Sequence, residues 1–291
     1  MVVVSPEDAL AAGAPARKHI VDVLIEERAP RLAASPLWPA ARPLLYALLG
    51  YRQARAMADA VAPMTGREAF DHASSLLSLR VEVRGLERIP RVGRVVIVSN
   101  HPTGLADGSA VYDALKAVRP DLCFFANADA FRVCPGFGDK IIPVEWVEAK
   151  RTRERTRLTL QRAREAFEAE RSVIIFPSGR LARRGRRGVL VEEPWAPSAL
   201  SLARKYDAPV LPMHLSGPAS TLFHLFDRVS GELRDITLFH ELLNKRGGTF
   251  RLIVGPLISA QALDPDAGVA TEAVKRYVSD VLPNDPDRAF P

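Results

Sequence analysis

The sequence predicts an α/β fold: a mixed, largely parallel sheet with flanking helices and an N-terminal helical extension that associates with membranes. Short apolar runs alternate with amphipathic helical segments through most of the chain, which favours parallel strands joined by helices. The chain has 291 residues, of which 47% are hydrophobic, so it is long enough to bury a large core. We divide it into an N-terminal helical extension, residues 1–78, and an α/β domain, residues 79–291.

The N-terminal extension is expected to be helical after a frayed start at residues 1–15. Residues 17–32 carry apolar side chains at helical spacing, and residues 57–79 also read as helix. Residues 37–51 are apolar almost throughout but shorter than the roughly 20 residues that span a bilayer. A Trp and a Tyr near the ends of this segment suit a membrane interface, so we predict an interfacial anchor, with a buried core helix as the alternative.

The α/β domain begins at residues 79–85, which alternate like a half-exposed strand. Buried strands are predicted at residues 95–99, 122–126, 172–176, 209–215 and 250–254. Helices are predicted at residues 107–118, 153–170 and 198–206. Residues 189–195 read as a loop that lines the site. This alternation implies a sheet with helices on both faces.

The most informative segment, residues 100–107, follows the predicted strand at residues 95–99. It places His101 at the carboxyl end of a strand, where open α/β sheets locate their chemistry, with Asp107 just beyond it. A His held by a carboxylate can remove a hydroxyl proton near neutral pH, so we predict His101 as a catalytic base and Asp107 as its partner. Two alternatives remain: Asp107 as an ordinary helix N-cap, and a serine hydrolase using Ser99 or Ser109.

A second turn follows the strand at residues 172–176. The order strand, His turn, helix, strand and Gly turn resembles the glycerolipid acyltransferase family, with its first motif Asn-His-x4-Asp and its third motif Phe-Pro-Glu-Gly-Thr-Arg. In this chain the motifs match Asn100, His101 and Asp107, then Phe176, Pro177, Gly179 and Arg180. Two features depart from the family pattern: five residues separate His101 from Asp107, and Ser178 stands where the family has a Glu that helps to grip the acceptor.

The resemblance covers about residues 80–258 and is stronger to a haemolysin-like subgroup related to the O-acyltransferases of ornithine-lipid synthesis. Residues 100–104, Asn-His-Pro-Thr-Gly, and residues 241–247, Glu-Leu-Leu-Asn-Lys-Arg-Gly, are similar to that subgroup. The resemblance implies transfer of a fatty acyl group from acyl-CoA or an acyl carrier protein to a lysolipid hydroxyl, with a lysophosphatidate-like acceptor. Lyso-ornithine lipid or another aminolipid is the alternative acceptor, and a lipid or carrier-protein binding module without catalysis is the alternative of another class.

Several residues are candidates for substrate binding around this centre. Thr103 and the amides near Gly104 would stabilise an oxyanion, and Gly179 would let the backbone approach a ligand. Arg180 offers a guanidinium fork for phosphate or carboxylate. The complete predicted set is Asn100, Thr103, Gly104, Lys140, Ser178, Gly179 and Arg180. For Lys140 the alternative is an exposed turn lysine, for Arg180 a surface cation, and His214 is expected to be a packed strand residue.

The chain carries a net charge of +6, concentrated between Lys150 and Gly188, where 13 Lys or Arg face 4 Glu. Such a patch suits an anionic membrane surface or an acidic carrier protein, unless it is simply a solvated helix face. Nucleic acid is not expected, since no aromatic residues interleave with the arginines. We expect no metal and no cofactor beyond the acyl thioester, in a peripheral or monotopic protein on the cytoplasmic face of the inner membrane.

Overall fold

The computed structural model describes residues 18–145, 151–185 and 190–291. Within them, seven strands form one sheet in the order β1-β9-β8-β2-β5-β3-β4. The strands are β1 Arg80–Arg84, β2 Val95–Ser99, β3 Cys123–Asn127, β4 Ile141–Val144, β5 Ser172–Ile175, β8 Val210–Ser216 and β9 Thr249–Val254. Neighbours are parallel except β8 and β9, which are antiparallel. The predicted mixed, largely parallel sheet is confirmed.

Helices pack against both faces of the sheet. In the body of the molecule they are α7 Leu105–Leu115, α8 Ala130–Val133, α9 Arg153–Glu168, α10 Ser198–Lys205, α11 Thr221–Asp227, α12 Gly231–Asp235, α13 Leu238–Leu243 and α14 Ala267–Arg276. Every residue of β2 is buried, and its side chains alternate between the two faces. Val95 and Ile97 share a core with α7, whereas Val96 and Val98 share another with α9, α10 and α14. The all-apolar run of β2 thus reflects burial on both sides.

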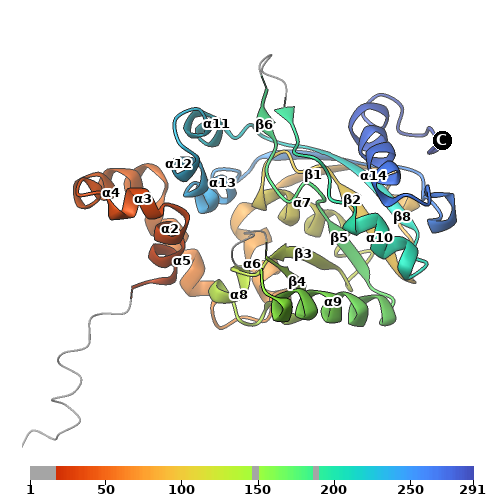
Figure 1. The fold of residues 1–291 in the computed structure, drawn as a ribbon, viewed down its shortest axis with the longest axis horizontal. Helices are drawn as coiled ribbons and strands as arrows, with labels where there is room; N and C mark the ends of the chain where they lie inside the picture. Colours follow the sequence, from red (N-terminus) through yellow and green to blue (C-terminus); the bar gives the residue numbers. More distant parts are fainter. Residues whose placement is uncertain (1–17, 146–150, 186–189) are drawn as a thin grey trace, which may run out of the picture.

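The N-terminal helices are α2 Ile20–Arg28, α3 Pro30–Ala34, α4 Trp38–Leu48, α5 Tyr51–Val61 and α6 Gly66–Leu77. Helices α2–α5 lie at one end of the molecule, beside α11–α13, and the C-terminus lies at the other end (Figure 1). Helix α6 packs against α7. Most of the buried apolar side chains of the N-terminal helices, among them Val21 and Leu24, belong to the same hydrophobic cluster as β2 and α7, whereas Val61 and Ala69 form a small separate cluster with Cys134. An ion pair of 2.8 Å between Arg28 and Asp129 adds to this packing. The extension is therefore anchored to the sheet through a shared core.

Two of the predicted N-terminal helices are interrupted, and local chemistry explains each break. The helix predicted over residues 17–32 divides at Ala29, because Pro30 cannot continue the hydrogen-bond ladder and instead begins α3. The helix predicted over residues 57–79 divides between α5 and α6. There Thr65 starts α6 with a capping box, in which its side chain and that of Glu68 each accept a main-chain N–H of the other.

Helix α4 lies within the segment predicted as an interfacial anchor. Trp38 is buried, but Leu37, Leu44 and Leu48 are 73%, 75% and 51% exposed. The alternative of a buried core helix is therefore wrong. No helix within the described ranges combines the length and the apolar character needed to cross a bilayer.

Two pairs of residues form strands that the sequence did not reveal. Arg183–Arg184 and Leu190–Val191 are β6 and β7, an antiparallel pair, so two residues of the predicted loop at residues 189–195 form a strand. Strand β4 was also missed. It is four residues long and contains Pro143, which a sheet tolerates because β4 is an edge strand.

Candidate active site

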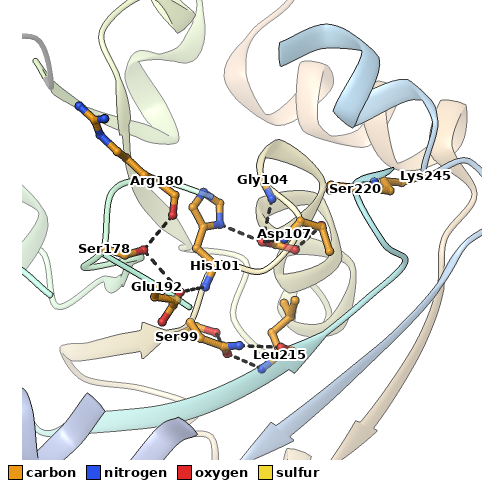
Figure 2. A network of polar contacts seen from close by, with 12 residues as sticks. Ser99, His101, Gly104, Asp107, Ser178, Arg180, Glu192, Leu215, Ser220 and Lys245 are labelled. Carbon is orange, nitrogen blue, oxygen red and sulfur yellow. Dashed lines mark hydrogen bonds and ion pairs between the residues drawn. The ribbon is translucent and has the colours of Figure 1, made fainter. Parts of the chain in front are cut away.

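The two motif turns meet at one edge of the sheet. Strands β2 and β5 are parallel neighbours, with Val98 opposite Ile175, so the turns that follow them emerge side by side. The main-chain N–H of Ala182 donates to the carbonyl oxygen of His101 over 3.0 Å and joins the two loops. The structure thus brings the His turn and the Pro-Ser-Gly-Arg turn together, as Figure 2 shows.

Asp107 is fully buried and accepts hydrogen bonds from four donors, drawn in Figure 2. They are the Nδ1 of His101 at 2.9 Å, the N–H of Thr103 at 2.9 Å, the hydroxyl of Thr103 at 2.5 Å and the N–H of Gly104 at 3.1 Å. These donors hold the carboxyl group at the start of α7. Asp107 is the third residue of α7, so the N-cap alternative is wrong in position: the N-cap residue is Gly104.

The longer spacing between His101 and Asp107 is accommodated at Gly104. Its φ of +87° is a backbone conformation that side chains rarely adopt, and a Cβ there would lie 2.9 Å from Cδ1 of Leu181. The turn consequently returns the chain so that the two side chains meet despite the additional residue. Glycine at position 104 serves both the turn and the close packing of the loop after β5.

His101 has one ring nitrogen engaged and the other unengaged. Its Nδ1 must carry the proton in the bond to Asp107, because an ionised carboxylate only accepts. The ring stacks on Phe176 with centroids 4.4 Å apart, and its side chain is 17% exposed. Among the described residues the Nε2 has no hydrogen-bond partner. This orientation fits a base whose Nε2 receives a proton from a substrate hydroxyl.

The other predicted residues of the His turn are engaged within the protein. Asn100 donates its amide to the carbonyl of Leu215 at 2.8 Å and accepts the N–H of Leu215 at 2.7 Å, which fastens the end of β2 to β8. The N–H groups of Thr103 and Gly104 point at Asp107. Our expectation that these two amides stabilise an oxyanion therefore does not agree with the geometry. Their role in the structure is to hold the carboxylate.

Neither serine proposed as a nucleophile contacts the histidine. Within the described ranges, the hydroxyl of Ser99 bonds only to the side chain of Asn100, at 3.4 Å, and Ser109 is buried in α7 without a bond to His101. The arrangement gives no support to a serine hydrolase.

The Pro-Ser-Gly-Arg turn presents a cation that has no partner within the described chain. Gly179 has a φ of +61°, and the hydroxyl of Ser178 donates to the carbonyl of Arg180 at 3.1 Å. The guanidinium of Arg180 is exposed and extends away from His101 in Figure 2. It is thus placed to meet an anionic group at the rim of the site rather than the reacting atoms.

Glu192 is a site residue that the sequence did not reveal. One carboxylate oxygen accepts the main-chain N–H of His101 at 2.5 Å, and the other accepts the indole N–H of Trp195 at 2.9 Å. The pKa of Glu192 lies above its usual value, because burial raises it more than the hydrogen bonds from His101 and Trp195 lower it. The only available signal was its place in the loop that we expected to line the site.

Lys140 is not part of this site. It lies at the amino end of β4, and hence at the edge of the sheet opposite His101, where its Nζ donates to the carbonyl of Pro120 at 2.7 Å. It is only 6% exposed, and burial lowers its pKa. Both the predicted ligand role and the alternative of an exposed turn lysine are therefore wrong.

In the Glu-Leu-Leu-Asn-Lys-Arg stretch, Glu241 and Lys245 form a buried ion pair, which we call the brace. Lys245 pairs with Glu241 at 2.9 Å and also donates to the carbonyl of Ala219 and the hydroxyl of Ser220. The segment that it holds begins at Gly217, where a Cβ would lie 2.9 Å from the methyl group of Thr103. The ion pair therefore holds the segment that packs against Thr103 in the Asp107 turn.

The remaining histidine on the sheet is a structural residue. His214 forms a ring hydrogen bond to the carbonyl of Val278 at 3.0 Å, and burial lowers its pKa, as expected for a packed strand residue. No group of three or more His, Cys, Asp or Glu residues in the described part of the chain is arranged to hold a metal ion.

Comparisons with known proteins agree with the motifs. The Acyltransferase family model matches residues 80–216. The lyso-glycine lipid O-acyltransferase of Phocaeicola vulgatus is 26% identical over 224 residues, 75% of this chain and 77% of that protein. That of Bacteroides thetaiotaomicron is 25% identical over 223 residues, 75% of this chain and 79% of the relative.

A solved structure was also found, the 1-acyl-sn-glycerophosphate acyltransferase PlsC of Thermotoga maritima. It matches with a TM-score of 0.47 and 17% identity, over 89% of this chain and 88% of that one. From the family model, the two relatives and the two motifs, we conclude that the chain is an acyltransferase of lipid metabolism that is similar to the glycerolipid acyltransferase family.

Proposed function

We propose that this enzyme moves a fatty acyl group from an acyl thioester to the hydroxyl group of a lysolipid, with His101 as the general base. The observation that carries the proposal is the 2.9 Å contact between Nδ1 of His101 and Asp107, which leaves Nε2 without a partner in the described chain. In the reaction, Nε2 removes the proton of the acceptor's hydroxyl group while the hydroxyl oxygen attacks the carbonyl carbon of the thioester. The carbon–sulfur bond then breaks, and the thiolate leaves with the proton that the imidazolium returns.

The acceptor that we propose to test first is an amino-acid lysolipid. Both curated relatives are named for lyso-glycine lipid, which favours an amino-acid lipid as the first acceptor to test, with lyso-ornithine lipid and lysophosphatidate beside it. Each of these acceptors carries an acidic head group. The exposed guanidinium of Arg180 suits such a group, since it binds carboxylate and phosphate oxygens alike.

The donor proposed is an acyl-CoA or an acyl carrier protein. Helix α9 starts on the same edge of the sheet as His101, and a groove of about 790 Å³ runs along it. Its lining includes Arg153, Arg157 and Lys205, which have no acidic partner within the described residues. Cations of this kind suit the phosphates of CoA and the acidic surface of a carrier protein.

We further propose that α4 attaches the enzyme to the membrane surface as an interfacial helix. Leu37, Leu44 and Leu48 are exposed on it, and one face of leucines on a short helix supports binding at the boundary of head groups and acyl chains. A basic patch elsewhere on the protein would supply the second, electrostatic contribution.

The test is direct acyl transfer by the purified full chain. Each lysolipid is incubated with acyl-CoA or acyl carrier protein, and products are read by mass spectrometry as a gain of one acyl group. We expect at least one pair to give product, and His101→Ala to lower kcat by roughly 10²–10⁴ with the fold intact. Product formation by His101→Ala at the wild-type rate would contradict the role of His101. No product from any pair would contradict the proposed reaction.

A further inference from the structure

Glu192 contacts both motif turns of the site and a tryptophan of its own loop. It comes from the loop after β7 and contacts the first residue of the His turn, which lies 91 positions earlier. Its second oxygen is held by Trp195, which is 5% exposed. The hydroxyl of Ser178 lies 3.5 Å from the first oxygen (Figure 2). A carboxylate therefore lies beside position 178, although position 178 itself is a serine.

The hydrogen bond from His101 to Glu192 acts on the backbone that aims the imidazole. The main-chain N–H and the side chain of His101 share one Cα, so the N–H bond and the bond from Nδ1 to Asp107 fix the residue at two points. A charge-assisted hydrogen bond to a carboxylate is stronger than one to a neutral acceptor. The carboxylate is itself held by the indole N–H, so it is not free to follow movements of the His turn.

We infer that Glu192 is a positioning residue for His101: its carboxylate clamps the main chain of the catalytic turn to the loop after β7 and so fixes the imidazole for proton transfer. This inference rests on the proposed role of His101 as the base. Misplacement of a reacting group by about 1 Å can lower a rate roughly 10²-fold, so loss of the clamp should act on kcat. Substrate binding should change little, because Glu192 is occupied by protein donors.

The principal variant is Glu192→Gln. A Gln side chain offers one oxygen and one NH₂ group, so if its oxygen accepts the N–H of His101 its NH₂ group faces the indole N–H of Trp195, donor against donor. We expect kcat to fall about tenfold or more, with the KM of donor and acceptor within about twofold of wild type. The matched control is Glu193→Gln, the same change at the next position, where the side chain pairs with Arg183 instead. This control should keep the wild-type kcat.

A second variant distinguishes a clamp from general damage to the fold. In Glu192→Gln/Trp195→Phe the opposing indole donor is absent, so the Gln oxygen can again accept the N–H of His101. We expect this double variant to be faster than Glu192→Gln, and Trp195→Phe alone, which removes one donor to the carboxylate but opposes none, to lose less kcat than Glu192→Gln. A double variant as slow as Glu192→Gln, or a Glu192→Gln enzyme with unchanged kcat, would overturn the inference.

A spectroscopic measurement separates this inference from the proposed reaction. Selective ¹⁵N-histidine labelling gives one backbone amide signal for each of the six histidines, and His101→Ala identifies that of His101. Its amide proton should move upfield in Glu192→Gln and stay in place in Glu193→Gln, because only the first change weakens the bond to a carboxylate. An unmoved signal would refute the clamp even if acyl transfer were never detected. A moved signal without any acyl transfer would leave the clamp intact and count against the proposed function alone.

Discussion

Asp107→Asn tests whether Asp107 serves catalysis or only the start of α7. If the amide oxygen of Asn takes the place of Oδ2, it keeps the bonds from His101, Thr103 and Gly104. The new NH₂ group then faces the hydroxyl of Thr103, which can rotate to accept it. The helix start is preserved, but the charge that stabilises the imidazolium is lost. We expect kcat to fall roughly 10²–10⁴-fold with a small change in stability.

Asp107→Ala should behave differently because it leaves buried donors without a partner. The amides of Thr103 and Gly104 each lose their acceptor, and a buried unsatisfied donor costs about 1–3 kcal/mol, so the loss is roughly 2–6 kcal/mol. Urea unfolding and acyl-transfer kinetics on both variants separate the two effects. Asp113→Asn is the matched control on the same helix, since Asp113 bonds to Ser74 and Lys116 away from the site. Near-native turnover in Asp107→Asn would refute the catalytic role.

Three further outcomes are expected. Replacing Leu44 and Leu48 by Glu should release the enzyme from anionic liposomes without lowering its melting temperature. The control Val92→Glu, at a residue that is 83% exposed, should leave the enzyme bound, and sedimentation with vesicles measures both. Arg180→Ala should raise the acceptor KM roughly tenfold or more, since a lost charge-assisted bond costs about 1.5–3 kcal/mol; an unchanged KM would place this cation outside the acceptor site. Lys245→Met should lower the free energy of unfolding by about 3–5 kcal/mol in urea titrations, because it leaves the buried carboxylate of Glu241 unpaired. A loss below about 1 kcal/mol would show that this ion pair does not stabilise the fold.

The sheet and the contact between His101 and Asp107 were predictable because their signals are local. The strand at residues 95–99 is apolar in every position but the last, and the structure has it at the same bounds. His101 and Asp107 are close in sequence and follow that strand directly, so their meeting depends on one turn. Strand β4 gave no such signal, because four residues with a proline at an edge resemble a loop.

The rest of the site depends on contacts that no local pattern encodes. Glu192 accepts a hydrogen bond from the main-chain N–H of His101. Every residue except proline has such an N–H, so the sequence gives no sign of this contact. The amides of Thr103 and Gly104 were expected to face the substrate, and only the turn geometry shows that they face Asp107. Lys140 was predicted as a substrate-binding cation from its position in the sequence. Because it precedes β4, a strand parallel to β3, it lies at the edge of the sheet opposite His101.

The pairing of β1 with β9 sets an order of events during synthesis. Arg80 of the first strand lies opposite Thr249 of the last, so about 165 residues must follow β1 before its partner exists. At roughly 5–20 residues per second, β1 waits about 10–30 s on the ribosome without a neighbour. Its outward charges Arg80, Glu82 and Arg84 make this exposed edge a poor template for pairing with another chain. The charged side chains of β1 face solvent in the folded enzyme, and during synthesis we expect them also to limit aggregation of the nascent chain.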